Sequence, residues 1–142
     1  MAVALLDVNV LIALSWPTHE DNPKVLRWIS QHAAQGWATC PFTQAAFVRI
    51  ISNPSFSSDA LRPADALTLL ERNVEGVPGH EFWPDQLSLA EAVKLSGQRL
   101  VGHNQVTDAY LVGLAIHRTG KVVTLDQGIA GWAKARHVEV IS

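Results

Sequence analysis

The hydrophobic positions of this chain fall into two kinds of segment that alternate along its length. Short segments, mostly apolar, predict strands, and they are Val3–Leu6, Trp37–Cys40, Glu81–Trp83, Lys121–Leu125 and His137–Ile141. Longer segments with helical apolar spacing predict helices, and they are Val8–Leu14, Asn22–Ala33, Phe42–Ile51, Pro63–Asn73, Leu87–Leu95, Val106–Thr119 and Asp126–Ala135. Because strands alternate with helices, we expect a parallel sheet in an α/β sandwich.

Local signals predict the ends and the buried faces of several helices. Asn22 precedes a proline and is predicted to cap the second helix, and Thr107 is predicted to cap the helix that contains Asp108. The spacing of the fourth helix turns Leu67 and Leu69 toward the core. Trp16, Trp28 and Trp83 are candidates for base stacking or protein contacts, with core packing as the alternative.

Composition narrows the class of protein. The chain has 142 residues, is 48% hydrophobic and 17% charged, which predicts one globular domain over residues 1–142. Its formal net charge of -2 means that any nucleic-acid contact comes from a local patch. Cys40 is the only cysteine, which excludes an internal disulfide and suits the cytoplasm. No apolar run reaches the ~20 residues of a membrane span, so no membrane partner is expected.

Asp7 is the most informative single residue because it directly follows the first apolar strand and precedes an apolar helix. A buried, ionised carboxylate without a partner costs several kcal/mol, so Asp7 requires a cation, hydrogen-bond donors or a proton. Asn9 is placed to donate to it and hold its rotamer. Capping of the following helix is the structural alternative, and this stretch alone does not separate the two.

Two further aspartates occupy comparable positions. Asp126 ends the apolar strand VVTLD as Asp7 ends VALLD, and Asp108 lies in the first turn of the strongest predicted helix. Since the carboxyl ends of parallel strands line the binding crevice, the three carboxylates are expected to converge there. Such a cluster needs a cation, and carboxylate oxygens suit Mg²⁺ or Mn²⁺. Taken singly, Asp108 also reads as a helix-dipole charge and Asp126 as a turn residue.

Other catalytic motifs are absent from the sequence. No glycine-rich phosphate loop follows the first strand, no histidine pair with a glutamate forms a zinc-protease motif, and no G-x-S-x-G elbow occurs. His103, in the loop before Asp108, is a candidate phosphate contact, with an exposed loop histidine as the alternative.

Four stretches together resemble PIN domains, and specifically the VapC-type toxins of VapBC toxin–antitoxin pairs. They are LLDVNVLIALSWP, WATCPFTQAAFVRIISNP, GHNQVTDAYLVGLA and VVTLDQGI, in that order along nearly the whole chain. The resemblance implies a PIN-like α/β/α sandwich with a central parallel sheet of four to five strands. It also implies a homodimeric endoribonuclease that depends on Mg²⁺ or Mn²⁺, cleaves a structured RNA and is neutralised by a cognate VapB antitoxin. Asp7, Asp108 and Asp126 match the catalytic and metal-binding acids, the last binding directly or through water.

One departure from the family pattern leaves a second interpretation open. Many PIN domains carry a glutamate after the second strand, whereas residues 22–58 contain no acid. Gln44 and Ala46 lie near that place. Thr43 and Gln44 are candidates for orienting a water or a phosphate oxygen, and Arg49 is a candidate RNA contact. The alternative function is therefore a catalytically impaired PIN scaffold that binds RNA or protein.

Overall fold

The computed structural model describes residues 2–129, 131 and 135–142, and its centre is a five-stranded sheet in the order β3-β2-β1-β4-β5. Every neighbouring pair of strands is parallel, which confirms the predicted sheet. The strands are β1 (Ala4–Leu6), β2 (Trp37–Thr39), β3 (His80–Phe82), β4 (Lys121–Thr124) and β5 (Val138–Val140).

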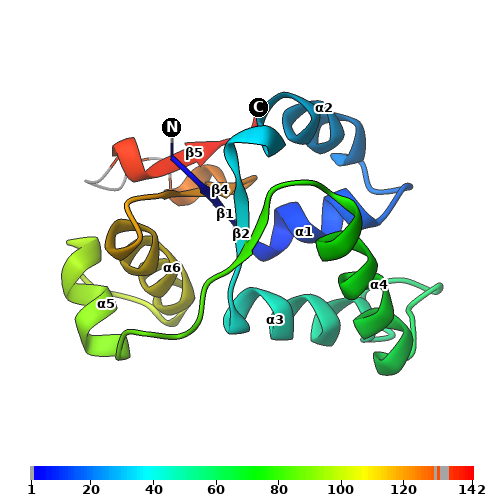
Figure 1. Cartoon of the computed structure of the whole chain (residues 1–142). Helices are drawn as coiled ribbons and strands as arrows, with labels where there is room; N and C mark the ends of the chain where they lie inside the picture. The colour runs from blue at the N-terminus through cyan, green and yellow to red at the C-terminus, as the bar shows by residue number, and fades with distance from the viewer. Residues whose placement is uncertain (1, 130, 132–134) are drawn as a thin grey trace.

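Helices cover both faces of the sheet, as Figure 1 shows, so the expected α/β/α sandwich is confirmed. Successive residues of β1 point to opposite faces. Leu6 packs in the core beneath α1 to α4, whereas Leu5 packs in the core beneath α5 and α6. The helices are α1 (Val8–Ser15), α2 (Asn22–His32), α3 (Pro41–Ile51), α4 (Pro63–Gly76), α5 (Leu89–Ser96) and α6 (Val106–His117).

The connections place the topological switch point beside β1. The chain leaves β1 toward β2 and β3 on one side, and later returns to the other side of β1 as β4. At such a point the loops after the two central strands diverge and leave a crevice at the carboxyl edge of the sheet. Asp7 follows β1 at this edge, and its backbone N–H donates to Val123 of β4 at 2.9 Å.

Close packing of α5 against α6 fixes the position of the last long helix. Gly113 of α6 lies so near α5 that an added Cβ would stand 2.0 Å from the Ala92 carbonyl oxygen. A residue larger than glycine at position 113 would therefore push the two helices apart. Because α6 carries Asp108 in its first turn, this contact also helps to position that carboxylate.

Several local predictions are corrected by the structure. The predicted helix Asp126–Ala135 is wrong where the structure describes it, since Gln127–Ile129 and Ala135–His137 are short 3₁₀ segments. Residues 130 and 132–134 of that prediction lie outside the described part. Leu67, predicted inside, is 49% exposed, because α4 lies at the edge of the molecule and buries only a narrow face.

Two predicted helix caps are also wrong. Asn22 is already the first helical residue of α2, and its buried amide donates at 2.7 Å to the carbonyl of Ala13 on α1. Thr107 lies inside α6, whose N-cap position is Gln105. Asn22 therefore uses its side chain for a contact with α1 instead of a cap. Thr107 lies two residues after the N-cap position of α6.

Two of the three candidate tryptophans belong to the core. Trp83 is 1% exposed and Trp28 is 7% exposed, with its indole N–H donating at 2.6 Å to the Glu139 carboxylate. Base stacking by these two side chains is therefore excluded by their burial, and the packing alternative is confirmed. Trp16 is half-buried and packs edge-on against Phe56 at a centroid distance of 5.1 Å. Among the described helices, none combines the length and the apolar character that crossing a membrane requires.

Candidate active site

Asp7 occupies the N-cap of α1 and is 7% exposed. One carboxylate oxygen accepts the Val8 N–H at 2.8 Å, and the other accepts the Thr124 hydroxyl at 2.8 Å. Burial raises the pKa of the Asp7 carboxyl, these two hydrogen bonds lower it, and the charge of Asp126 raises it; the net shift is upward. Asp7 thus caps the helix, which confirms the structural alternative, and it also lines the crevice, so its role as a metal ligand stays a prediction.

Thr124 joins the loop after β1 to the loop after β4. Its fully buried hydroxyl donates to Asp7 and accepts the Asn9 amide at 3.2 Å and the Asp126 backbone N–H at 3.1 Å. The Asn9 carbonyl oxygen in turn accepts the Leu125 N–H at 3.2 Å. Asn9 therefore holds Asp7 through Thr124 and not by the direct hydrogen bond that the sequence suggested.

Thr124 was not among the site residues predicted from the sequence. The signal that was present is a threonine two residues before Asp126 at the end of an apolar strand. Its importance depends on the pairing of β1 with β4, which no local pattern reveals.

Asp108 is half-buried in the first turn of α6 and faces the same crevice. Burial and the charges of Asp7 and Asp126 raise the pKa of the Asp108 carboxyl to about 6. The positive end of the helix dipole at this position favours the anion but does not offset the other effects. Both carboxyl groups therefore favour their protonated forms more than an exposed aspartate does, and a cation bound beside them would favour the ionised forms.

Asp126 contributes charge to this group without completing a ready set of ligands. It is exposed, and its carboxylate accepts the Gly128 N–H at 2.8 Å. In the described residues, no three His, Cys, Asp or Glu side chains lie close enough to hold one metal ion together. That Asp126 joins Asp7 and Asp108 at a metal ion, directly or through water, stays a prediction, and linkage through water is compatible with this arrangement.

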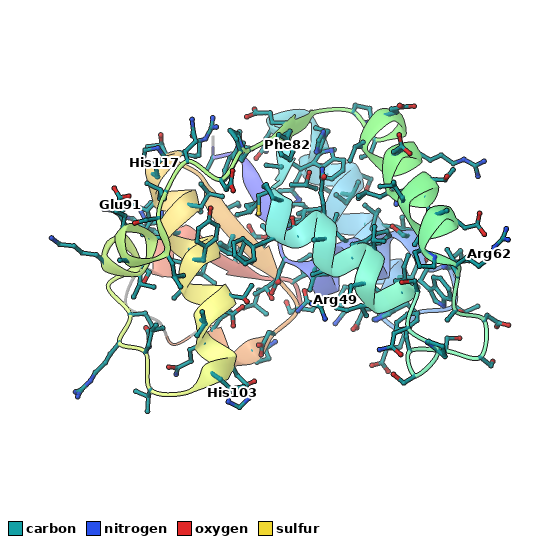
Figure 2. All side chains as sticks on the ribbon, turned by 90° about the horizontal axis from the view of Figure 1, so that it is seen from below. Arg49, Arg62, Phe82, Glu91, His103 and His117 are labelled. Atoms are coloured by element: carbon teal, nitrogen blue, oxygen red, sulfur yellow. The ribbon has the colours of Figure 1, made fainter. Side chains whose placement is uncertain are left out.

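The carboxylates of Asp7 and Asp108 open onto a cleft of about 540 Å³. Its opposite wall is one face of α3, and Figure 2 shows Arg49 on this helix and His103 at the start of α6. The residues that line the cleft are Asp7, Val8, Asn9, Phe42, Ala45, Ala46, Arg49, Ile50, Thr107 and Asp108. The cleft therefore has an acidic side, a largely apolar side and one guanidinium group.

The other predicted supporting residues lie outside the lining of this cleft. Thr43 is buried and caps its own helix, accepting the Cys40 N–H at 3.0 Å. Gln44 donates to the Thr39 hydroxyl at 2.9 Å, so its amide is directed to β2. His103 is exposed in the 3₁₀ turn His103–Gln105 that precedes α6. Of the supporting and RNA-binding candidates, the structure brings Asn9 and Arg49 to the aspartates.

The donor set fits a divalent cation. Asp7 and Asp108 form no ion pair within residues 2–129, 131 and 135–142, although their carboxyl groups share one cleft. Carboxylate oxygens are the ligands that Mg²⁺ and Mn²⁺ prefer, and both ions accept water for the remaining positions. The chemistry of the residues present is thus compatible with the metal that the family resemblance implies.

Comparison with known proteins gives a consistent family assignment. The family profile described as PIN domain matches residues 4–135. Ribonuclease VapC39 of Mycobacterium tuberculosis is 42% identical over 138 residues, which cover 97% of this chain and 99% of the relative. Ribonuclease VapC38 of the same organism is 42% identical over 135 residues, with 94% and 92% covered.

Solved structures agree on the fold. The VapBC2 complex of Rickettsia felis, bound to a DNA fragment from its promoter, contains a chain that matches with a TM-score of 0.70 at 12% identity, covering 99% of both chains. FitAcB of Neisseria gonorrhoeae matches with a TM-score of 0.59 at 18% identity, covering 99% of this chain and 97% of the other. At these identities the likeness establishes the architecture alone.

Proposed function

The chain belongs to the PIN-domain family and, within it, to the VapC ribonucleases, and from this membership we propose that it is a toxin that cleaves a structured RNA in the cleft beside Asp7 and Asp108. Residues 1–142 would act as one PIN domain. The observation that carries the proposal is the pair of carboxyl groups with raised pKa, one directly after β1 and one in the first turn of α6, that line one cleft.

Asp7 and Asp108 are the proposed ligands of Mg²⁺ or Mn²⁺, and Asp126 would join them through water. When bound, the cation polarises the scissile phosphate and stabilises the charge that develops on the leaving oxygen. Thr124 and Asn9 are positioning residues, since they fix the carboxylate of Asp7 and the loop that carries Asp126. Hydrogen bonds to the side chains that bind a metal fix the orientation of those side chains and tune the basicity of their oxygens.

Arg49 is the proposed contact for a phosphate that neighbours the scissile one. It lines the cleft opposite the carboxylates, and it is the only charged residue of α3. A guanidinium group binds phosphate oxygens with two parallel hydrogen bonds, so it would hold the backbone of the RNA against the acidic side. Because the whole chain carries a net charge of -2, such local contacts provide the attraction for RNA.

The proposed partners are a VapB antitoxin and a second copy of the chain. The matching solved structures include the toxin–antitoxin complexes VapBC2 and FitAcB, which supports an antitoxin for this chain as well. We place the activity in the cytoplasm, where the RNA substrate is found. The antitoxin would act by preventing RNA from entering the cleft.

A specific observation favours the second candidate function, a PIN scaffold that binds without cutting. The face of α3 that lines the cleft offers alanines, an arginine and an isoleucine, and no acid. If the site has lost catalysis, RNA binding would persist without metal-dependent cleavage. Retention of Asp7, Asp108 and their hydrogen-bonded supports is the argument for the enzyme.

Induced expression of the chain in a bacterial host tests the proposed toxin. Wild-type protein is expected to stop growth and to produce discrete RNA fragments whose ends map to one or a few unpaired sites. The Asp108→Asn variant, produced at the same level, is expected to do neither. Growth arrest without RNA fragments, or equal arrest by the variant, would contradict the proposal.

A further inference from the structure

The cleft side of α3 carries a pattern that metal binding does not explain. Phe42, Ala45, Ala46, Arg49 and Ile50 follow the spacing i, i+3, i+4, i+7 and i+8, so they form one face of the helix, and all five line the cleft. A helix face that is open to water is normally polar. Here the Arg49 guanidinium is the only charged group on the helix face, and the other four side chains are apolar. The face lines the same cleft as the carboxylates of the candidate active site.

Phe42 is the aromatic member of this face. It is 45% exposed, although its ring packs on the ring of Tyr110 at a centroid distance of 4.6 Å and an interplanar angle of 43°. Tyr110, on α6, is 2% exposed and belongs to the hydrophobic core between the sheet and helices α5 and α6. One side of the Phe42 ring is therefore held by the core while much of the ring remains available to the cleft.

Exposure of the Phe42 ring to water is unfavourable, because burial of a phenylalanine side chain is favourable. Exposed apolar residues also occur singly elsewhere on this chain, Phe82 among them, so exposure alone assigns no role. What distinguishes Phe42 is its place in the cleft, where it shares the lining with Arg49 and Asp108. This place indicates what the ring binds.

We propose that Phe42 is a stacking platform for one unpaired base of the RNA substrate, and that it positions this nucleotide beside the cleaved bond. This inference rests on the proposed function and adds a substrate-positioning residue to it. Every base has an aromatic face that stacks on a phenyl ring, and its flanking phosphates require cations. The cleft offers these features together, namely the Phe42 ring, the Arg49 guanidinium and two carboxylates suited to a divalent cation.

The geometry favours an unpaired nucleotide over a base-paired one. In an A-form helix the faces of the bases are covered by their neighbours, so a side chain on the surface of the duplex does not reach them. A cleft of about 540 Å³ lies within the size range of small-ligand sites, so it admits one splayed nucleotide. The small side chains of Ala45 and Ala46 leave room beside the Phe42 ring for the inserted base.

Binding of RNA in the absence of cleavage tests this proposal. The four fluorescein-labelled homohexaribonucleotides are titrated by anisotropy, with Mg²⁺ present, into protein that carries Asp108→Asn. Adding Phe42→Leu is expected to weaken binding of the preferred oligonucleotide at least about fivefold, as expected for the loss of one stacked base. Phe42→Trp is expected to retain affinity within about twofold, because the indole ring stacks at least as well.

Phe82→Leu is the matched control. Phe82 is 49% exposed on the edge strand β3 and does not line the cleft, so its replacement is expected to leave RNA affinity unchanged. Figure 2 labels both Phe82, on β3, and Arg49, on the helix α3 that lines the cleft, so the two positions can be compared there. Thermal unfolding and light scattering of each variant report the folded state and the number of copies associated.

The outcomes separate the two proposals. Unchanged affinity in folded Phe42→Leu protein, or equal losses in Phe42→Leu and Phe82→Leu, would overturn the stacking platform alone. The same applies if Phe42→Leu leaves RNA affinity unchanged and instead disrupts association between copies, since Phe42 would then serve a protein contact. If wild-type protein neither binds nor cleaves RNA, the proposed function fails together with the platform.

Discussion

The hydroxyl of Thr124 donates a 2.8 Å hydrogen bond to the carboxylate of Asp7, across 117 residues of sequence. This contact joins the residue that follows β1 to the last residue of β4, at the switch point of the sheet. The hydrogen bond stabilises the ionised form of the Asp7 carboxyl, which burial alone would disfavour. The arrangement explains how the fold keeps an acid inside an apolar edge of the sheet.

Replacement of Thr124 tests whether this contact positions Asp7. Thr124→Val keeps the shape but removes the donor, so the Asp7 carboxylate loses a hydrogen bond and its pKa rises further. We expect metal affinity, measured by calorimetry with Mn²⁺, to fall about 10- to 100-fold. Thr124→Ser retains the hydroxyl and should stay near wild type. Equal losses in both variants would show that packing of the methyl group, and not the hydrogen bond, is what matters.

Stability of the metal-free protein should decrease as pH rises between about 4 and 6. The pKa of Asp108 is 3.8 when unperturbed and about 6 in the fold, so the folded state binds more protons than the unfolded state in this window. Asp108→Asn removes the ionised form and should stabilise the protein at pH 7 by roughly 1–2 kcal/mol, after discounting the shift for solvent screening. Urea unfolding at pH 4.5 and pH 7 in EDTA measures the effect.

Comparison of Asp108→Asn with wild type cancels the contribution of other titrating groups, including His80, whose pKa burial lowers. Asp59→Asn, in an exposed loop, is the matched control and should change the unfolding free energy by less than about 0.5 kcal/mol. Addition of Mg²⁺ should stabilise wild type more at pH 7 than at pH 4.5, because only the ionised carboxylates bind it. A stabilisation by Asp108→Asn that is as large at pH 4.5 would contradict this account.

Arg49 should contribute to RNA affinity through phosphate. Arg49→Gln is expected to weaken binding to all RNA sequences to a similar degree, because phosphate contacts carry no sequence information. The slope of log affinity against log salt concentration should decrease by about 0.7 for a single strand. Arg62→Gln is the control. Arg62 is exposed, does not line the cleft and pairs with Asp65. An unchanged slope for Arg49→Gln would remove Arg49 from the interface.

Gly113 should be required for the packing of α5 on α6. Gly113→Ala places a methyl group against the Ala92 carbonyl oxygen and should cost about 1–3 kcal/mol of unfolding free energy. Gly76→Ala, at a helical position with nothing within 4 Å of the added methyl group, should be neutral or stabilising by up to about 1 kcal/mol. Chemical denaturation measures both, and a stable Gly113→Ala variant would show that α5 can move away from α6.

Much of the fold follows from local patterns, because apolar spacing is a property of short segments. The strands, the six long helices and the switch-point location of Asp7 were predictable for this reason. The segment after Asp126 was not, since its described parts, Gln127–Ile129 and Ala135–His137, are 3₁₀ turns although the apolar spacing is typical of a helix. Asn22 was misread as a cap because its true partner, the Ala13 carbonyl, belongs to a different helix.

The candidate site was only partly predictable for a related physical reason. Asp7 and Asp108 stand out because a charge at the end of an apolar segment requires an explanation. Thr124 and Phe42 do not stand out in sequence, since a threonine in a strand and a phenylalanine in a helix are ordinary. Their roles appear only when β4 lies beside β1 and α3 faces α6 across the cleft.

Cleavage of RNA by the purified protein tests the central claim most directly. Total bacterial RNA is incubated with wild type, Asp7→Asn and Asp108→Asn, each with Mg²⁺, with Mn²⁺ and with EDTA, and the new ends are mapped. The account predicts discrete fragments from wild type that require the metal and are lost in both variants. Fragments that persist in EDTA or in Asp108→Asn protein, or metal binding and RNA binding without any cleavage of RNA from the natural host, would contradict it.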